Sequence, residues 1–373
     1  MINITLELNR KCNFRCTYCY LKDKLDYEMT AETAKRSIDF AVKKYELDKD
    51  PKKEIGVNFI GGETLCSFPM IKKTISYINE TYPDIKFVYS MTTNGSLINE
   101  DIVSFLIEND FYVKISLDGR REDNDLNRVW VSGKGTFDDV IKRFKYLNRY
   151  QIELNRGIQV NSVVTKNNYM NYADNLKFLV DEGGLRSIDL SINKGDVWSD
   201  EDLNSLAEVM EKALDYYMER NMNNVFFSWD FIEKAYKNHL RKGDKRLFKC
   251  GGGVSSFYIA WNGDIFMCPS CMEKEFVIGK VEDDLGGLWY SEIIKNKGLT
   301  KIDNQKCMAC KYSDVCPTKG CFINSYTENG SIHQPSRISC FVTRMTAGLY
   351  QDHKTEIDEI MRRRDEYLKH SQS

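Results

Sequence analysis

The 373-residue sequence lacks any long apolar run, and this absence limits where the protein can act. No stretch approaches the ~20 consecutive apolar residues that a membrane-spanning helix needs. The opening residues, MINITLELNR, alternate apolar and polar side chains, which is typical of a strand and not of the apolar core of a signal peptide. We therefore expect a cytoplasmic protein that has no membrane partner.

An excess of charge of one sign is also missing. The formal net charge is -2, and basic and acidic residues are interleaved along the chain. This pattern argues against a nucleic-acid partner, which would require a basic patch or stripe. The one basic run, residues 361–370 (MRRRDEYLKH), is expected to form the solvated face of a helix. We find neither an internal repeat nor a low-complexity linker.

Cysteine, in contrast, is abundant. The chain has 12 cysteines, three of them between residues 12 and 19 and eight between residues 250 and 340. In the reducing compartment that we expect, so many cysteines are unlikely to form a disulfide framework. Metal binding is therefore the leading explanation for them.

The first part of the chain, to about residue 220, alternates β-rich runs with amphipathic helical stretches, as βα units around a parallel sheet do. The six expected strands cover residues 2–8, 55–60, 87–93, 111–117, 157–164 and 187–193. Six units are fewer than the eight that close a TIM barrel. We therefore predict an α/β fold in which a partial (β/α)6 TIM-like barrel precedes a loop-rich, cysteine-rich domain and a C-terminal helix.

The cysteine triplet directly follows the first expected strand. Cys12, Cys16 and Cys19 have the spacing Cys-x3-Cys-x2-Cys. A structural zinc ion takes four protein ligands, and a [4Fe-4S] cluster has four irons to ligate, so three cysteines leave one iron open. An open iron suits a cluster that must bind a substrate or cofactor directly. The position at the C-terminal mouth of a barrel is where such folds build their active sites.

This motif in this place resembles the radical S-adenosylmethionine (SAM) superfamily. The resemblance implies that Cys12, Cys16 and Cys19 ligate a [4Fe-4S] cluster whose open iron chelates the amino and carboxylate groups of SAM. It also implies the reaction: reductive cleavage of SAM gives a 5′-deoxyadenosyl radical that abstracts hydrogen from the substrate.

Further parts of the family pattern follow at successive strand ends. The resemblance assigns SAM contacts to Tyr18, Gly61, Gly62, Glu63, Asn94, Ser116, Arg128 and Leu190. The Gly-Gly-Glu element would approach the methionine amino group, where a residue without Cβ allows close contact. Arg128 would pair with the SAM carboxylate, whereas an arginine in this context taken alone is usually a surface residue. The family usually has proline after the glutamate, and this chain has Thr64.

The second cysteine group resembles the SPASM domain, a C-terminal extension of radical SAM enzymes that carries two auxiliary [4Fe-4S] clusters. The resemblance implies one cluster on Cys307, Cys310, Cys316 and Cys340, and another on Cys250, Cys268 and Cys321. The fourth position of the latter is either open or filled by Cys271. Four residues separate Cys316 from Cys321 where the family commonly has three. The expected cofactors are thus SAM and three [4Fe-4S] clusters.

Other interpretations of the cysteines remain open. The CPSC and CMAC pairs also have the spacing of a zinc ribbon. Cys271 could instead be a thiol that donates hydrogen to a peptide radical. Cys66, alone after the Gly-Gly-Glu element, is expected to be buried and inert. A non-catalytic metal-binding scaffold would not need the open-iron triplet or the SAM elements.

Two substrate classes compete. Proteins with this domain pair largely modify peptides or proteins, and an electron donor such as flavodoxin or ferredoxin is implied. Sulfatase-maturating enzymes, which oxidise Cys or Ser to formylglycine, carry an aspartate as a base directly after the second cysteine, but here Pro269 follows Cys268. We therefore favour maturation of a ribosomally made peptide by thioether or carbon–carbon crosslinking or by epimerisation, with thioether formation first, although another residue such as Asp230 could supply a base.

The sequence predicts four segments. They are the barrel at 1–220, a helical bridge at 221–247, the SPASM domain at 248–345 and the C-terminal helix at 346–373.

Overall fold

The computed structural model describes most of the chain. The described residues are 1–21, 24–48, 54–242, 250–270, 272–283, 307, 309–319 and 321–371. The contacts divide the chain into two compact units. Unit 1 comprises Met1–Ile115, Val129–Arg156 and Phe248–Ile302, and unit 2 comprises Ser116–Arg128, Gly157–Leu247 and Asp303–Ser373.

Unit 1 is built on one row of strands in the order β10-β9-β8-β1-β2-β3-β4. Their bounds are β1 Ile2–Glu7, β2 Glu54–Ile60, β3 Lys86–Thr93, β4 Tyr112–Ser116, β8 Ser256–Ile259, β9 Asp264–Phe266 and β10 Gly279–Lys280. Strands β8, β1, β2, β3 and β4 run parallel, and β9 is antiparallel to both of its neighbours. The carboxyl ends of β1 to β4 therefore share one edge, which is the edge that carries the candidate site.

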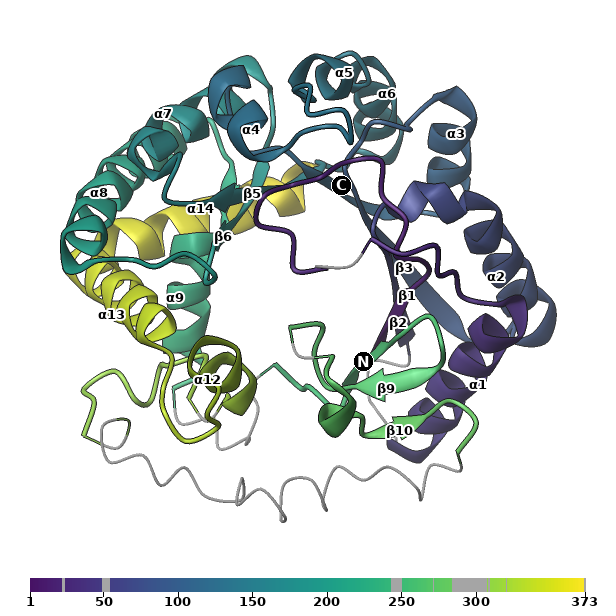
Figure 1. Ribbon diagram of the computed structural model, residues 1–373. Helices are drawn as coiled ribbons and strands as arrows, with labels where there is room; N and C mark the ends of the chain where they lie inside the picture. The colour runs from purple at the N-terminus through teal and green to yellow at the C-terminus, as the bar shows by residue number, and fades with distance from the viewer. Residues whose placement is uncertain are drawn as a thin grey trace. The chain divides into compact units, whose positions relative to one another are not determined.

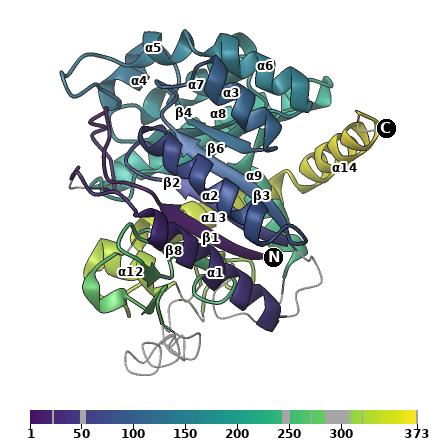
Figure 2. The same cartoon turned by 90° about the vertical axis from the view of Figure 1, so that its right-hand side faces the viewer.

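Helices cover one face of these strands. Those of unit 1 are α1 Ala31–Asp48, α2 Phe68–Thr81, α3 Glu100–Glu108, α5 Phe137–Ile141 and α6 Phe144–Leu154, with the short turns η1 Thr64–Ser67 and η4 Lys274–Phe276. Figures 1 and 2 show α1 and α2 lying along β1 and β2. Ile38 and Ala41 of α1 are fully buried, as are Ile4 and Leu6 of β1. Burial of this apolar face stabilises the layer.

Unit 2 contains three parallel strands in the order β5-β6-β7, which are β5 Gln159–Val164, β6 Ser187–Ile192 and β7 Ser228–Trp229. Its helices are α4 Arg121–Asn127, α7 Tyr172–Lys177, α8 Asp200–Met222, α9 Asp230–Leu240, α12 Phe322–Asn329, α13 Arg337–Asp352 and α14 Lys354–Ser371, with the turns η2 Tyr169–Asn171 and η3 Phe178–Glu182. Its core includes Trp229, whose indole Nε1 donates to the hydroxyl of buried Tyr172 at 2.8 Å.

The predicted fold class is confirmed. All six expected strands are present, and neither row of strands closes on itself, as an open barrel requires. The strands β7 to β10 were not predicted, because they are two to four residues long and too short for a periodic pattern. The four predicted segment boundaries stay predictions. Among the described residues, no helix combines the length and apolarity needed to cross a membrane.

The C-terminal helix corrects one expectation about the basic run. Both terminal guanidinium nitrogens of Arg364 on α14 donate to the carboxylate of Glu233 on α9, Nη1 to Oε1 and Nη2 to Oε2 at 2.9 Å. The side chains are 12% and 1% exposed, respectively, so this arginine belongs to the interior of unit 2 and not to a solvated face. Glu233 also accepts the backbone N–H of Trp229 at 3.0 Å.

Candidate functional site: a cysteine loop beside the Gly-Gly-Glu turn

The three N-terminal cysteines lie in a loop that follows β1, here called the cysteine loop (residues 10–21). Its backbone is held by the segment after α4: the N–H of Arg15 donates to the carbonyl of Val129 at 2.7 Å. The ring of Phe14 packs edge-on against Trp130, with 4.7 Å between centroids. These contacts fix the path of the loop between its first two cysteines.

The thiols of the loop differ in their surroundings. The Cys12 sulfur accepts the N–H of Phe14 at 3.4 Å, and burial raises the pKa of this thiol to about 11. Cys16 lies within electrostatic reach of Cys12, since a thiolate there raises the same pKa. The ammonium of Lys24 donates to the Cys19 sulfur at 2.7 Å. The loop thus carries the three sulfurs, and Lys24, just beyond it, directs a cation at one of them.

The Gly-Gly-Glu turn follows β2 and packs directly against the cysteine loop. The N–H of Gly62 donates to the Asn9 carbonyl at 3.0 Å, and that of Glu63 donates to the Lys11 carbonyl at 2.6 Å. A Cβ at Gly62 would stand only 2.2 Å from the Lys11 oxygen, and one at Gly61 would stand 3.0 Å from the Asn9 oxygen. In this structure Gly62 is therefore required for the close approach of the two loops, whereas a side chain at Gly61 would only be tightly packed.

The carboxylate of Glu63 is fully engaged within the protein. It accepts from the backbone N–H groups of Leu65 at 2.9 Å and Asn94 at 2.7 Å, and from the hydroxyl of Thr93 at 2.5 Å. Burial raises its pKa, while these hydrogen bonds favour the charged form. Glu63 joins the ends of β2 and β3, and its predicted contact with SAM stays a prediction.

A polar network that we had not predicted connects the cysteine loop to the end of β3. The amide of Asn94 donates to Asn13 at 2.8 Å, and Asn13 donates to the hydroxyl of Ser96 at 2.9 Å. Ser96 in turn donates to the Asn94 oxygen at 2.7 Å. The only available signal was the position of Asn13 inside the motif, directly after Cys12. Its amide positions the loop that carries the first cysteine.

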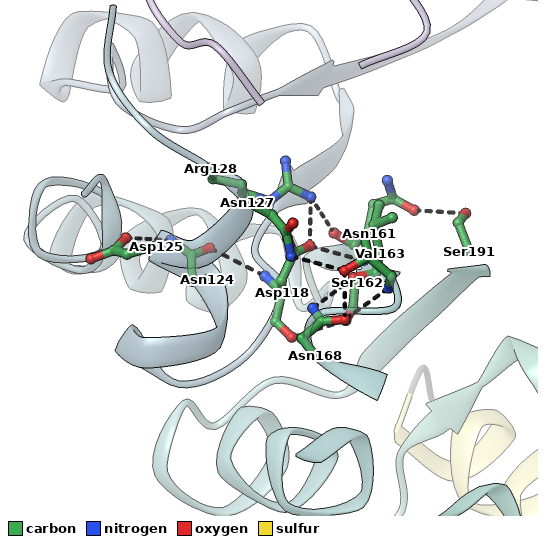
Figure 3. Close-up of polar contacts among 11 residues, drawn as sticks. Asp118, Asn124, Asp125, Asn127, Arg128, Asn161, Ser162, Val163, Asn168 and Ser191 are labelled. Carbon is green, nitrogen blue, oxygen red and sulfur yellow. Dashed lines mark hydrogen bonds and ion pairs between the residues drawn. The ribbon is translucent and has the colours of Figure 1, made fainter. Parts of the chain in front are cut away.

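Arg128 is buried and not on the surface, with 4% of the residue exposed. Its Nη2 donates to Asp118 at 2.8 Å and to the carbonyl of Asn161 at 3.3 Å, and Asp118 also accepts the N–H of Val163 at 2.8 Å (Figure 3). The pair ties the segment after β4 to strand β5. The guanidinium is thus already oriented by protein groups, as a preorganised anion contact requires.

The remaining predicted SAM contacts are distributed over other elements. Ser116 is the last residue of β4 and is partly exposed, as is Tyr18 in the cysteine loop. Leu190 lies on β6, where its backbone N–H donates to Asp230 at 2.7 Å. The roles of these three residues stay predictions.

Within unit 1, two of the SPASM cysteines repeat a feature of Cys12. The Cys250 sulfur accepts the N–H of Gly252 at 3.4 Å, and the Cys268 sulfur accepts that of Ser270 at 3.5 Å. In all three cases the donor is the amide two residues further on. A backbone N–H is thus directed at each of these three sulfurs. Cys271 lies outside the described residues.

Within unit 2, four cysteines form one electrostatic group. Burial raises the pKa of Cys340, and thiolates at Cys307, Cys316 and Cys310 raise it further. Cys310 packs against a small core of Tyr312, Val315 and Ala347. These four are the cysteines assigned to one auxiliary cluster. Cys321 precedes α12 at its N-terminus.

The donor chemistry of the cysteines within each unit fits iron–sulfur clusters, since thiolate sulfur is the ligand that such clusters take. Among the described residues, no three Cys, His, Asp or Glu side chains already stand together as a metal site. Cys66, expected to be buried, is exposed in the turn η1, which is a correction.

Two family models match this chain, one over its first part and one over its cysteine-rich part. Residues 6–180 match the model of the radical SAM superfamily, and residues 250–312 match that of SPASM, an iron–sulfur cluster-binding domain. The chain carries a radical SAM domain and an SPASM domain. This pairing makes it a radical SAM protein whose SPASM domain contributes strand β8 to the sheet edge beside β1.

Several known proteins are similar over most of their length. An uncharacterized protein of Methanocaldococcus jannaschii, MJ0907, is 29% identical over 313 residues, covering 84% of this chain and 96% of that protein. The cysteine-type anaerobic sulfatase-maturating enzyme of Clostridium novyi is 27% identical over 323 residues, covering 83% and 84%. The mycofactocin maturase MftC of Mycolicibacterium smegmatis is 27% identical over 333 residues, covering 84% and 76%.

Solved structures support the same fold. Native anSMEcpe with bound AdoMet and Cp18Cys peptide has a TM-score of 0.79 at 19% identity, covering 96% of this chain and 99% of that one. Streptococcus suis SuiB bound to precursor peptide SuiA has a TM-score of 0.64 at 20% identity, covering 91% and 75%. At these identities the likeness extends to the fold alone.

The position of Arg128 leads to a prediction about SAM binding. Arg128→Ala is expected to weaken SAM binding by about 1.5–3 kcal/mol, the range for hydrogen bonds to charged groups, without changing iron content. Isothermal titration with SAM measures it. Asp118→Asn is the matched control, because it removes the ion pair and keeps the guanidinium. Equal losses of SAM affinity in both variants would make Arg128 a structural residue only.

Proposed function

We propose that this protein is a radical SAM maturase that modifies a peptide or protein, and that its product is a thioether or another crosslink in a ribosomally made peptide. The proposal is supported by the radical SAM and SPASM matches and by the packing of the cysteine loop against the Gly-Gly-Glu turn. The peptide complexes of anSMEcpe and SuiB also support a peptide substrate.

The residues assigned to the cofactors have distinct tasks in this proposal. When bound, SAM and the first cluster would supply the 5′-deoxyadenosyl radical that takes a hydrogen atom, and an auxiliary cluster would supply an acceptor for the remaining electron. Cys12, Cys16 and Cys19 hold the first cluster, with the loop oriented by Asn13. Arg128 orients the carboxylate of SAM.

With these groups, the atoms and electrons of thioether formation are all accounted for. One hydrogen atom leaves a substrate carbon and the substrate thiol loses a proton, so that a carbon–sulfur bond replaces the C–H and S–H bonds. One electron remains and requires an acceptor. The reaction also needs an external reductant, for which a flavodoxin or a ferredoxin is the expected class.

One observation favours crosslinking over formylglycine formation. Neither of the two positions at which the sequence suggested a base offers a free carboxylate. Pro269 follows Cys268. Asp230 accepts the backbone N–H of Leu190 through Oδ1 and is paired with Lys234 through Oδ2. Its carboxylate is therefore already bonded to the backbone of β6 and paired with a lysine, and it is 15% exposed.

Sulfatase maturation by formylglycine formation remains the second candidate, because the Clostridium novyi relative is named a cysteine-type anaerobic sulfatase-maturating enzyme. The test is mass spectrometry of cysteine-containing peptides after anaerobic incubation with reconstituted protein, SAM and dithionite. Loss of two hydrogens together with loss of one alkylatable thiol supports crosslinking. An aldehyde in place of a cysteine, trapped by a hydrazide, would establish sulfatase-type maturation and contradict the proposal.

A further inference from the structure

Lys24 is placed against the sulfur of the third cysteine of the loop. Its Nζ lies 2.7 Å from the Cys19 sulfur, and the side chain is only partly exposed. It is also within electrostatic reach of Cys12, where it favours the thiolate. One ammonium therefore faces the first and the last cysteine of the motif, although it lies five residues beyond the end of the motif.

This geometry has a direct consequence for an iron–sulfur cluster. Hydrogen bonds to the ligand sulfurs and nearby charge are among the terms that set a cluster's reduction potential. A cation beside a thiolate stabilises the state with the larger negative charge, which is the reduced state. A lysine acts here as a compact point charge with three donors.

We propose that Lys24 is a positioning residue for the radical SAM cluster: it holds the Cys19 thiolate by a charge-assisted hydrogen bond and raises the cluster's reduction potential. The inference rests on the assignment of Cys12, Cys16 and Cys19 as cluster ligands. A higher potential makes the cluster easier for a one-electron donor to reduce.

The test is a redox titration of reconstituted protein followed by electron paramagnetic resonance. The signal that changes when SAM is added reports the radical SAM cluster, which separates it from the auxiliary clusters. In Lys24→Met, the reduced fraction relative to the oxidised one at a fixed potential should fall about tenfold, which corresponds to a midpoint about 59 mV lower. Lys24→Arg retains the charge and should stay near the wild-type value.

A second lysine provides a matched control. Lys86 begins β3, at the opposite end of the strands from the cysteine loop, and pairs with Glu54. Lys86→Met removes the same charge and should leave the midpoint unchanged. An unchanged midpoint in Lys24→Met, or an equal shift in Lys86→Met, would overturn the proposal. Loss of the SAM-responsive signal when Cys12, Cys16 and Cys19 are replaced confirms the ligand assignment; its persistence would overturn that assignment instead.

Discussion

Replacement of Cys12, Cys16 and Cys19 together by alanine is expected to abolish formation of 5′-deoxyadenosine from SAM. The wild-type protein, reconstituted anaerobically, should hold about twelve irons, because three clusters need four each, and the triple variant should retain about eight. The reason is local: the loop is held by Asn13, Phe14 and Arg15, so removing the three sulfurs removes the cluster without removing the anchors.

Cys66→Ala is the control for this experiment. Cys66 is exposed and follows the Gly-Gly-Glu turn, so its replacement should change neither iron content nor SAM cleavage. Continued formation of 5′-deoxyadenosine by the triple variant would show that the motif has been misassigned. Bound zinc with about four irons in the wild type would remove the auxiliary clusters and restore the zinc-ribbon interpretation.

The second large effect concerns stability. Arg364→Ala is expected to lower the free energy of unfolding by about 3–5 kcal/mol, since removing one member of a buried ion pair leaves the other charge buried without its closest partner. The carboxylate left behind, Glu233, is 1% exposed, and among the described residues it keeps contacts with Trp229, Tyr217 and, at 3.7 Å, the ammonium of Lys237. The measurement is the thermal midpoint, together with hydrogen exchange of the amides in α14.

The neighbouring residue offers a matched control. Arg363 is also partly exposed, but its contacts are with polar groups near the end of α8 and not with a buried carboxylate: it donates to the Met222 carbonyl and to Asn224. Arg363→Ala should change the free energy of unfolding by less than about 1 kcal/mol, as for exposed polar contacts. If the two variants have the same thermal midpoint, the interior position of Arg364 contributes nothing beyond a surface contact.

Sequence patterns predicted the local elements better than the contacts between distant residues. The six longer strands follow from alternating or continuous apolar runs of β-branched residues, and the structure places the cysteine loop after the first of them. The Gly-Gly-Glu element was predicted at the end of β2 and lies there, though its glycines and Glu63 first serve contacts within the protein.

Interactions that depend on tertiary partners could not be predicted from the sequence. Arg364 lies in a run of three arginines, and no periodicity distinguishes the one whose partner, Glu233, lies 131 residues earlier. The exposure of Cys66 could not be predicted either, because exposure depends on what packs over a turn and not on the residue type. The role of Asn13 was not predicted, because the motif that contains it was interpreted through its three cysteine sulfurs alone.

The pairing of β1 with β8 also bears on how the chain is made. Asn3, Ile4 and Leu6 are synthesised long before their partners on one side, which are Ser256, Phe257 and Ile259. Until the ribosome has extended the chain beyond β8, that edge of β1 stays unpaired, and such an edge is a template for association with other chains. Closing so long a loop is also slow. Production of the protein should therefore depend on chaperones that shield the nascent N-terminal strand until the cysteine-rich region arrives.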